Sequence, residues 1–167
     1  MFVNLITYTY NPWNYIEFIR LKGHILIDVH VFPPAEAPSK IQFVFDSGAY
    51  ITVMNRLNAH RIGLPLTGIY NANITGFNKN RGSDKAEIIL VQKIEIGKFI
   101  IEDVKILVPL EDIEVIEVIG ENVLEYFTYT VDHNIDRIYF NKNLNPKPYK
   151  NLEKDIYLSC GRVLTQV

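Results

Sequence analysis

The 167-residue sequence predicts a single, mainly β domain, closed into a barrel or folded as a sandwich, with one or two short helices. The length suits one domain and is short for two. Isoleucine, valine, tyrosine and phenylalanine fall in short runs that glycine, proline and asparagine interrupt, which is typical of strands joined by turns. Apolar residues make up 48% of the chain and charged residues 22%, so a disordered chain and a fibrous repeat are excluded.

The clearest strand pattern lies at residues 24–32, where every second residue is isoleucine or valine and these side chains share one face. The proline-rich segment that follows ends the ladder, because proline supplies no amide donor. We expect a second strand at residues 41–45 and a short buried run at 51–54. One or two helical turns should follow at residues 55–61, ended by Gly63.

A long hairpin is expected next. Residues 69–75 and 87–96 have strand character, and they flank a polar stretch with two glycines at residues 76–85. A tight turn at Gly97 then leads into a further strand at residues 99–108.

The remaining elements are an apolar run that ends at a glycine, a short helix, and two strands around a polar turn. They lie at residues 115–119, 121–127, 128–131 and 137–140. We therefore expect a domain at residues 23–142. Residues 1–22 form an N-terminal extension, interpreted as a strand or a dimer arm, and residues 143–167 form a C-terminal extension.

Charge and targeting signals narrow the class of protein further. The formal net charge of −2 gives no basic surface for a nucleic acid or an anionic membrane. No apolar stretch is long enough to span a membrane, and the first ten residues lack the features of a secretory signal. The single cysteine, Cys160, has no partner for an internal disulfide. We expect a cytoplasmic protein.

The most informative motif is Asp46-Ser47-Gly48-Ala49, which follows three large apolar residues. Aspartate, serine and glycine are common turn formers, so an ordinary turn at a strand end is one interpretation. A solvated turn carboxylate usually follows a polar strand end, however, whereas this one emerges from a buried strand. The setting therefore favours a functional carboxylate.

In this setting the sequence resembles the retropepsin-like aspartic proteases, which include retroviral, bacterial and Gag-polyprotein-type members. The resemblance covers residues 24–140 and depends on features in the same order. These are the Asp46 turn followed by residues 51–54, the hairpin around Thr75-Gly76-Phe77, the two strands of residues 93–108, Val118-Ile119-Gly120 before a helix, and the segments 130–132 and 137–140.

The resemblance implies a retropepsin-like closed β-barrel, the acid protease fold, with a long flap hairpin. It implies an aspartic endopeptidase in which two carboxyl groups share one proton and activate a water molecule. Asp46 is then catalytic; Ser47, Gly48 and Ala49 form the active-site loop; and Ile74, Thr75, Gly76 and Phe77 belong to the flap that binds substrate.

The partners follow from the number of motifs. Because the chain has one Asp-Ser-Gly-Ala sequence, the catalytic pair requires Asp46 from each of two chains, and therefore a homodimer. A peptide or protein substrate would bind as an extended strand. The four histidines are scattered without metal-ligand spacing, so we expect no metal and no other cofactor.

Two positions differ from the family pattern. Glu121 stands where retroviral members commonly carry arginine, and Tyr50 is larger than the residue usually found after the turn. Both changes affect the usual ion pair between this loop and the helix. They leave open a catalytically inactive module of the same fold that dimerises or binds peptides.

A third interpretation is an unrelated β-barrel for a small apolar ligand. The terminal extensions are expected either to form a sheet between subunits or to block the cleft.

Overall fold

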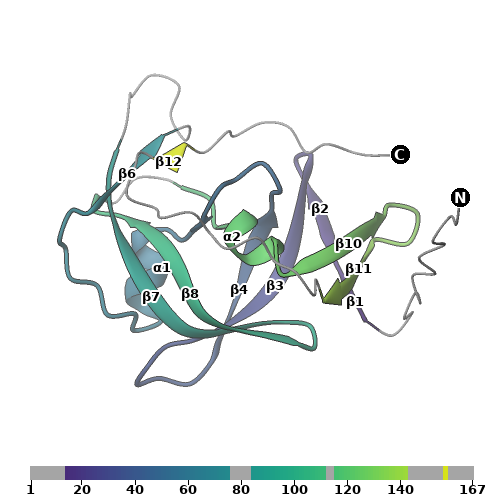
Figure 1. Cartoon of the computed structure of the whole chain (residues 1–167), viewed down its shortest axis with the longest axis horizontal. Helices are drawn as coiled ribbons and strands as arrows, with labels where there is room; N and C mark the ends of the chain where they lie inside the picture. The colour runs from purple at the N-terminus through teal and green to yellow at the C-terminus, as the bar shows by residue number, and fades with distance from the viewer. Residues whose placement is uncertain (1–13, 76–83, 112–114, 143–155, 158–167) are drawn as a thin grey trace, which may run out of the picture.

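A computed structural model describes residues 14–75, 84–111, 115–142 and 156–157 (Figure 1). This part of the chain is mainly β, with two short helices. The elements are β1 (Tyr15–Glu17), β2 (Ile19–Leu21), β3 (His24–Phe32), β4 (Ser39–Phe45), β5 (Thr52–Val53), α1 (Arg56–Arg61), β6 (Ala72–Thr75), β7 (Asp84–Ile96), β8 (Phe99–Pro109), β9 (Val118–Ile119), α2 (Glu121–Leu124), β10 (Phe127–Asp132), β11 (Arg137–Lys142) and β12 (Ile156–Tyr157).

The larger sheet closes on itself. Its strands follow the order β12-β6-β7-β8-β5-β9-β4-β3-β2, and an additional pairing joins β3 to β7. This pairing places Val31 opposite Ile94 and completes a ring of six strands: β3, β7, β8, β5, β9 and β4. The predicted mainly β fold with a closed barrel is therefore confirmed.

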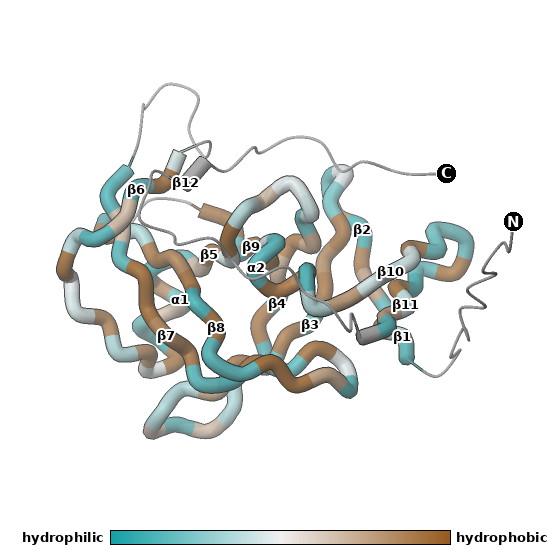
Figure 2. Tube along the Cα trace, in the orientation of Figure 1, coloured by the Kyte–Doolittle hydropathy of each residue, from teal (hydrophilic) through white to brown (hydrophobic). Residues whose placement is uncertain are grey.

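The alternating pattern of β3 builds one wall of the barrel. Ile25, Ile27, Val29 and Val31 are each at most 4% exposed, as a strand with one buried face requires. β3 pairs in antiparallel fashion with β4 and places Ile27 opposite Phe43, which is fully buried. Figure 2 shows stretches of hydrophobic residues along β4 and β7.

A second, smaller sheet of order β1-β11-β10 packs beside the barrel (Figure 1). Aromatic rings join the two sheets. The ring centroid of Phe45, at the end of β4, lies 4.8 Å from that of Tyr129 of β10 and 6.3 Å from that of Phe140 of β11. The ring centroids of Phe140 and Phe127 lie 5.2 Å apart. Tilted and edge-on ring contacts of this kind add specificity to apolar burial. The small sheet is therefore anchored on the strand that carries Asp46.

Some boundaries differ from those predicted. β7 begins at Asp84 rather than at Glu87, because Asp84 and Lys85 pair with Ile74 and Asn73 across the hairpin. The helix predicted for residues 121–127 ends at Leu124, and the following turn leads into β10. Of the apolar run at residues 115–119, the last two residues form β9.

Both predicted extensions contain strands. In the N-terminal one, β1 pairs with β11 and β2 pairs with β3. In the C-terminal one, β12 lies parallel to β6, with Ile156 opposite Ile74 and Tyr157 opposite Thr75 (Figure 1). The division into residues 1–22, 23–142 and 143–167 stays a prediction. Within the described ranges, neither helix has the length and apolar composition needed to cross a membrane.

Candidate active site

Asp46 begins a tight turn at the end of β4. The N–H of Gly48 donates a hydrogen bond of 2.8 Å to Asp46 Oδ1, and the N–H of Ala49 donates one of 3.2 Å to the Asp46 carbonyl oxygen. Asp46 is half-buried, Ala49 is buried, and Ser47 and Gly48 are exposed. The turn therefore fixes one carboxylate oxygen, and its two middle residues face the solvent.

The strand β9 pairs with the strands on both sides of this turn. It lies between β4 and β5, so that Val118 pairs with Val44 in parallel and with Val53 in antiparallel fashion. The N–H of Asp46 donates a hydrogen bond of 3.2 Å to the carbonyl oxygen of Ile119. Because the chain enters and leaves the turn beside the same strand, the position of Asp46 is set by the barrel rather than by a free loop.

Gly120 allows the chain after β9 to pass close to the turn. A Cβ atom at this position would lie 2.4 Å from the carbonyl carbon of Ile51 and 2.6 Å from its oxygen, so only glycine fits without displacing the backbone. The next residue, Glu121, donates its N–H to the carbonyl oxygen of Ala49 at 2.7 Å. The sequence Val118-Ile119-Gly120 thus brings the start of α2 against the Asp46 turn.

A buried polar network also joins the turn to α2. Asn122 Oδ1 accepts hydrogen bonds from the N–H of Thr52 at 2.7 Å and from its hydroxyl at 2.9 Å. Asn122 Nδ2 donates to the carbonyl oxygen of Lys105, and the N–H of Gly120 donates to Thr52 Oγ1 at 3.2 Å. Neutral hydrogen bonds therefore connect the loop to the helix. The sequence alone did not predict these contacts; the signal available in it was a threonine within an apolar run.

The hairpin of β6 and β7 contributes to the same part of the molecule. Ile74 is 1% exposed and belongs to one apolar cluster with Ala49 of the turn, while Thr75 is half-buried. The other buried members of this cluster are Val44, Ile51, Val53, Ala86, Leu107 and Val118. The structure therefore brings together two of the predicted site segments. Gly76 and Phe77 lie outside the described residues.

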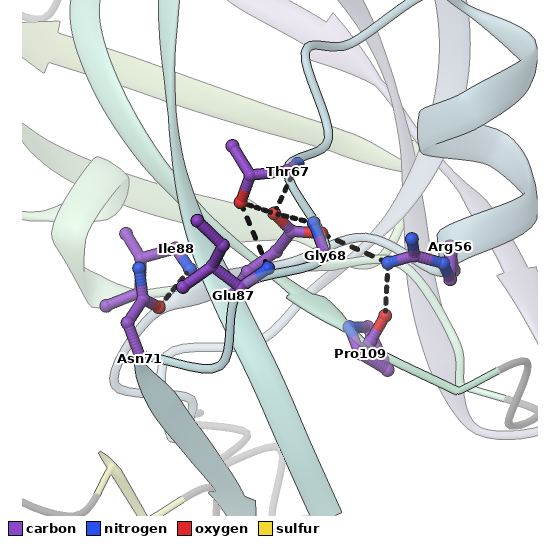
Figure 3. Close-up of polar contacts among 8 residues, drawn as sticks. Arg56, Thr67, Gly68, Asn71, Glu87, Ile88 and Pro109 are labelled. Atoms are coloured by element: carbon purple, nitrogen blue, oxygen red, sulfur yellow. Dashed lines mark hydrogen bonds and ion pairs between the residues drawn. The ribbon is translucent and has the colours of Figure 1, made fainter.

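A second buried polar side chain, Glu87 of β7, lies at the base of this hairpin (Figure 3). Its carboxylate accepts hydrogen bonds from the Thr67 N–H at 2.8 Å, from the Thr67 hydroxyl at 2.7 Å and from the Gly68 N–H at 3.1 and 3.2 Å. Arg56 Nη1 of α1 lies 3.0 Å from Glu87 Oε1 and 3.4 Å from the Pro109 carbonyl oxygen.

These contacts determine the pKa of Glu87. Burial on its own raises the pKa of a carboxyl group, but the hydrogen bonds from Thr67, Arg56 and Gly68 together lower the pKa of Glu87 below its ordinary value. The carboxylate is therefore kept ionised. From the sequence, Glu87 was expected only as the first residue of a strand, because its ion-pair partner lies 31 residues away.

Other acidic residues have local partners. Asp132 Oδ1 accepts a hydrogen bond from the Asn134 N–H at 2.9 Å, as expected for a turn cap, and Asp28 pairs with Lys40 at 3.1 Å on the surface. In the ranges that the structure describes, no three histidine, cysteine, aspartate or glutamate side chains are close enough to hold a metal ion. Among the acidic residues considered, Asp46 and its turn are therefore the candidate active site.

Comparisons with known proteins point in the same direction. Residues 37–126 match the family model "gag-polyprotein putative aspartyl protease", a range that includes the Asp46 turn, the hairpin and Gly120. The chain is similar to the crystal structure of a retropepsin-like aspartic protease from Rickettsia conorii, with 27% identity and a TM-score of 0.59 over 77% of this chain and 90% of that one.

It is also similar to EIAV protease complexed with the inhibitor HBY-793, with 17% identity and a TM-score of 0.44 over 64% of this chain and 90% of that one. A search of curated proteins finds no match.

Proposed function

Because this chain belongs to the gag-polyprotein aspartyl protease family, a retropepsin-like family, we propose that it is an aspartic endopeptidase that acts as a homodimer. The family supports a protease function. The observation that carries the proposal for this chain is the Asp46 turn: a carboxylate with one oxygen held by the Gly48 N–H, on a turn fixed by β9, and present once per chain.

In the proposed mechanism, the two Asp46 carboxyl groups of the dimer share one proton. Two adjacent like charges disfavour double ionisation, so one group stays protonated while the other is a carboxylate. The carboxylate accepts a proton from a water molecule, which attacks the carbonyl carbon of the peptide bond, and the protonated group donates to the carbonyl oxygen. The tetrahedral intermediate then collapses: the carboxyl group that took the proton from water donates it to the leaving nitrogen, the C–N bond breaks, and a hydroxyl group of the intermediate returns its proton to the other carboxylate.

Each remaining residue of the turn has a role in this proposal. Ser47 and Gly48 are exposed in the single chain, and in the proposed dimer they would lie at the contact with the second subunit. The Gly48 N–H holds Asp46 Oδ1 in place through a hydrogen bond of 2.8 Å and so orients the carboxyl group. Ala49 is buried and connects the turn to the apolar cluster of the hairpin.

We assign substrate binding to the hairpin. An extended peptide would pair with its backbone, and Ile74, Thr75, Gly76 and Phe77 would form this side of the binding site. Ile74 in β6 supports the assignment, since it shares an apolar cluster with Ala49 of the turn. β12 lies along β6 in the free chain, so a substrate strand that used this edge would have to displace it.

Cleavage of a peptide library by the full-length chain tests the proposal. We expect cleavage by the wild type, loss of cleavage in Asp46→Asn, and inhibition by a statine-type peptide, whose hydroxyl occupies the place of the attacking water. Asp28→Asn is the matched control, because it makes the same chemical change at a surface ion pair. Cleavage that persists undiminished in Asp46→Asn would exclude Asp46 as the catalytic group. Peptide binding by both wild type and Asp46→Asn, without cleavage by either, would identify the inactive binding module instead.

A further inference from the structure

Two polar side chains, Thr52 and Glu87, are buried among the residues that the structure describes, and they lie under different parts of the proposed site. Thr52 supports the Asp46 turn through Asn122. Glu87 is at the base of the β6–β7 hairpin, to which the proposed function assigns substrate. This distribution suggests that each buried network fixes one half of the site.

The carboxylate of Glu87 connects three separate parts of the chain (Figure 3). It lies on β7, pairs with Arg56 of α1, and accepts hydrogen bonds from Thr67 and Gly68 in the loop that leads into β6. Gly68 has a φ of +71°, a conformation in which other residues are strained, so the loop takes a specific path past the carboxylate. Glu87 therefore fixes the approach to β6.

Asn71 then connects this loop to β7, directly before the first residue pair of the β6–β7 hairpin. The N–H of Asn71 donates to the carbonyl oxygen of Ala86 at 3.1 Å, and Asn71 Oδ1 accepts from the N–H of Ile88 at 2.8 Å. The ladder then places Ala72 opposite Ala86. Since side chains alternate along a strand, a shift of one residue would turn Ile74 out of its buried position. The loop contacts therefore set the register of β6.

Burial of a charged pair is a poor way to gain stability, because apolar residues of similar volume often stabilise as well or better. A buried carboxylate whose contacts come from a helix and a loop can, however, select one arrangement of those segments. The pair of Glu87 with Arg56 is such a case, with the carboxylate side chain 1% exposed and that of Arg56 26% exposed.

We propose that Glu87 is a positioning residue for substrate: by holding Thr67 and Gly68, it sets the register and orientation of β6 and so the binding of the peptide backbone. This inference rests on the proposed function. It assigns no chemistry to Glu87, whose effect on the reaction is exerted through β6.

The test compares Glu87→Gln with the wild type in the full-length chain, using a peptide that the wild type cleaves. We expect KM to rise about tenfold and kcat to change less than about threefold, since the change weakens substrate binding more than the chemical step. Hydrogen exchange at the backbone amides of residues 68–75 should become faster in the variant. Asp28→Asn, which breaks an exposed ion pair on β3, should leave KM, kcat and the exchange rates unchanged.

A second control separates positioning from general stability. Ile101→Val removes a methylene group from the core of β8, where Ile101 is 6% exposed and paired with Ile94. Both variants are assayed at a temperature at which circular dichroism shows them fully folded. The proposal is overturned if Glu87→Gln leaves KM unchanged, or if Ile101→Val raises KM as much for the same loss of melting temperature.

A milder variant covers the case in which Glu87→Gln does not fold. Thr67→Val removes the hydroxyl that lies 2.7 Å from the carboxylate but keeps the backbone contact at 2.8 Å. It should raise KM by about threefold, less than Glu87→Gln does, because the other hydrogen bonds to the carboxylate remain; an unchanged KM contradicts the proposal. If the wild type cleaves no peptide, or cleavage does not depend on Asp46, the proposed function fails. In that event faster exchange in the variants still supports the role of Glu87 in fixing β6, and unchanged exchange contradicts it.

Discussion

Gly120→Ala should be among the most damaging small substitutions in the protein. The new Cβ would lie 2.4 Å from the carbonyl carbon of Ile51, 2.6 Å from its oxygen and 2.9 Å from its nitrogen. These are backbone atoms, which cannot rotate away as the end of a flexible side chain can. The φ of Gly120 is −102°, so alanine is not strained by its backbone conformation, and the whole effect comes from this close approach.

The size of the effect follows from packing. Extra atoms in a closely packed region cost about 1–3 kcal/mol and occasionally more. Because rigid backbone is contacted here, we expect a loss of about 3 kcal/mol, which for a domain of this size lowers the melting temperature by roughly 6–12 °C. The adjustment must also move the Asp46 turn, since the Glu121 N–H is bonded to the carbonyl oxygen of Ala49. A catalytic group misplaced by this route reduces kcat by about 10²-fold.

Thermal unfolding followed by circular dichroism measures the effect, with Gly23→Ala as the control. Gly23 has a φ of +83° and nothing within 4 Å of the position of its Cβ, so its substitution carries conformational strain without a contact, a loss of about 1 kcal/mol. A close contact at Gly120 is refuted if Gly120→Ala lowers the melting temperature no more than Gly23→Ala does.

Three further predictions concern the polar networks and the C-terminal strand. Thr52→Val keeps the shape of the side chain but removes the acceptor of the Gly120 N–H and one of the two hydrogen bonds to Asn122 Oδ1, so urea unfolding should show a loss of about 1–3 kcal/mol. The pKa of Glu87 is lowered in the folded protein from 4.5, so its stabilising contribution is complete above that pH and is lost as the pH falls through the folded value. Urea titrations at several pH values give the difference in free energy of unfolding between wild type and Glu87→Gln. This difference should shrink in acid, and a difference that stays constant with pH would contradict the prediction. Proline at both Ile156 and Tyr157 should release β12 from β6 and lower KM about threefold if substrate uses that edge, whereas an unchanged KM would show that it does not.

Local sequence patterns were sufficient to predict the long barrel strands β3, β4, β7 and β8 and the hairpin, whereas β5 and β9 were expected only as apolar runs. The alternation in β3 requires one buried face, and all four of its predicted inward residues are buried. The polar stretch between residues 75 and 87 interrupts the strand character on either side, and β6 and β7 do pair across it. These features depend on neighbours in sequence, and so they are readable from sequence.

The N-terminal strands illustrate what local patterns do not reveal. β1 and β2 have three residues each, and Ile19 and Leu21 of β2 are more than half exposed, so no alternation of burial marks them. They form strands because the backbone of β1 pairs with β11 and the backbone of β2 pairs with β3. The turn between β2 and β3, at Lys22 and Gly23 with φ values of 51° and 83°, was the one local signal available.

The candidate site divides in the same way. Asp46 could be predicted because its motif is contiguous and follows a buried strand. The partners of Thr52 and Glu87 could not, because Asn122 lies 70 residues from Thr52 and Arg56 lies 31 residues from Glu87. A single buried polar residue in an apolar run indicates that a partner exists, but only the fold determines which residue it is.

The account depends most on the pairing of two Asp46 carboxyl groups. A crystal structure of the full-length chain with a statine-type peptide measures this directly. We expect a two-fold dimer in which a carboxylate oxygen of each Asp46 lies about 2.6–3.2 Å from the statine hydroxyl. A bound peptide held by a single chain, or a dimer in which the two carboxyl groups are too far apart to contact one hydroxyl, would contradict the account.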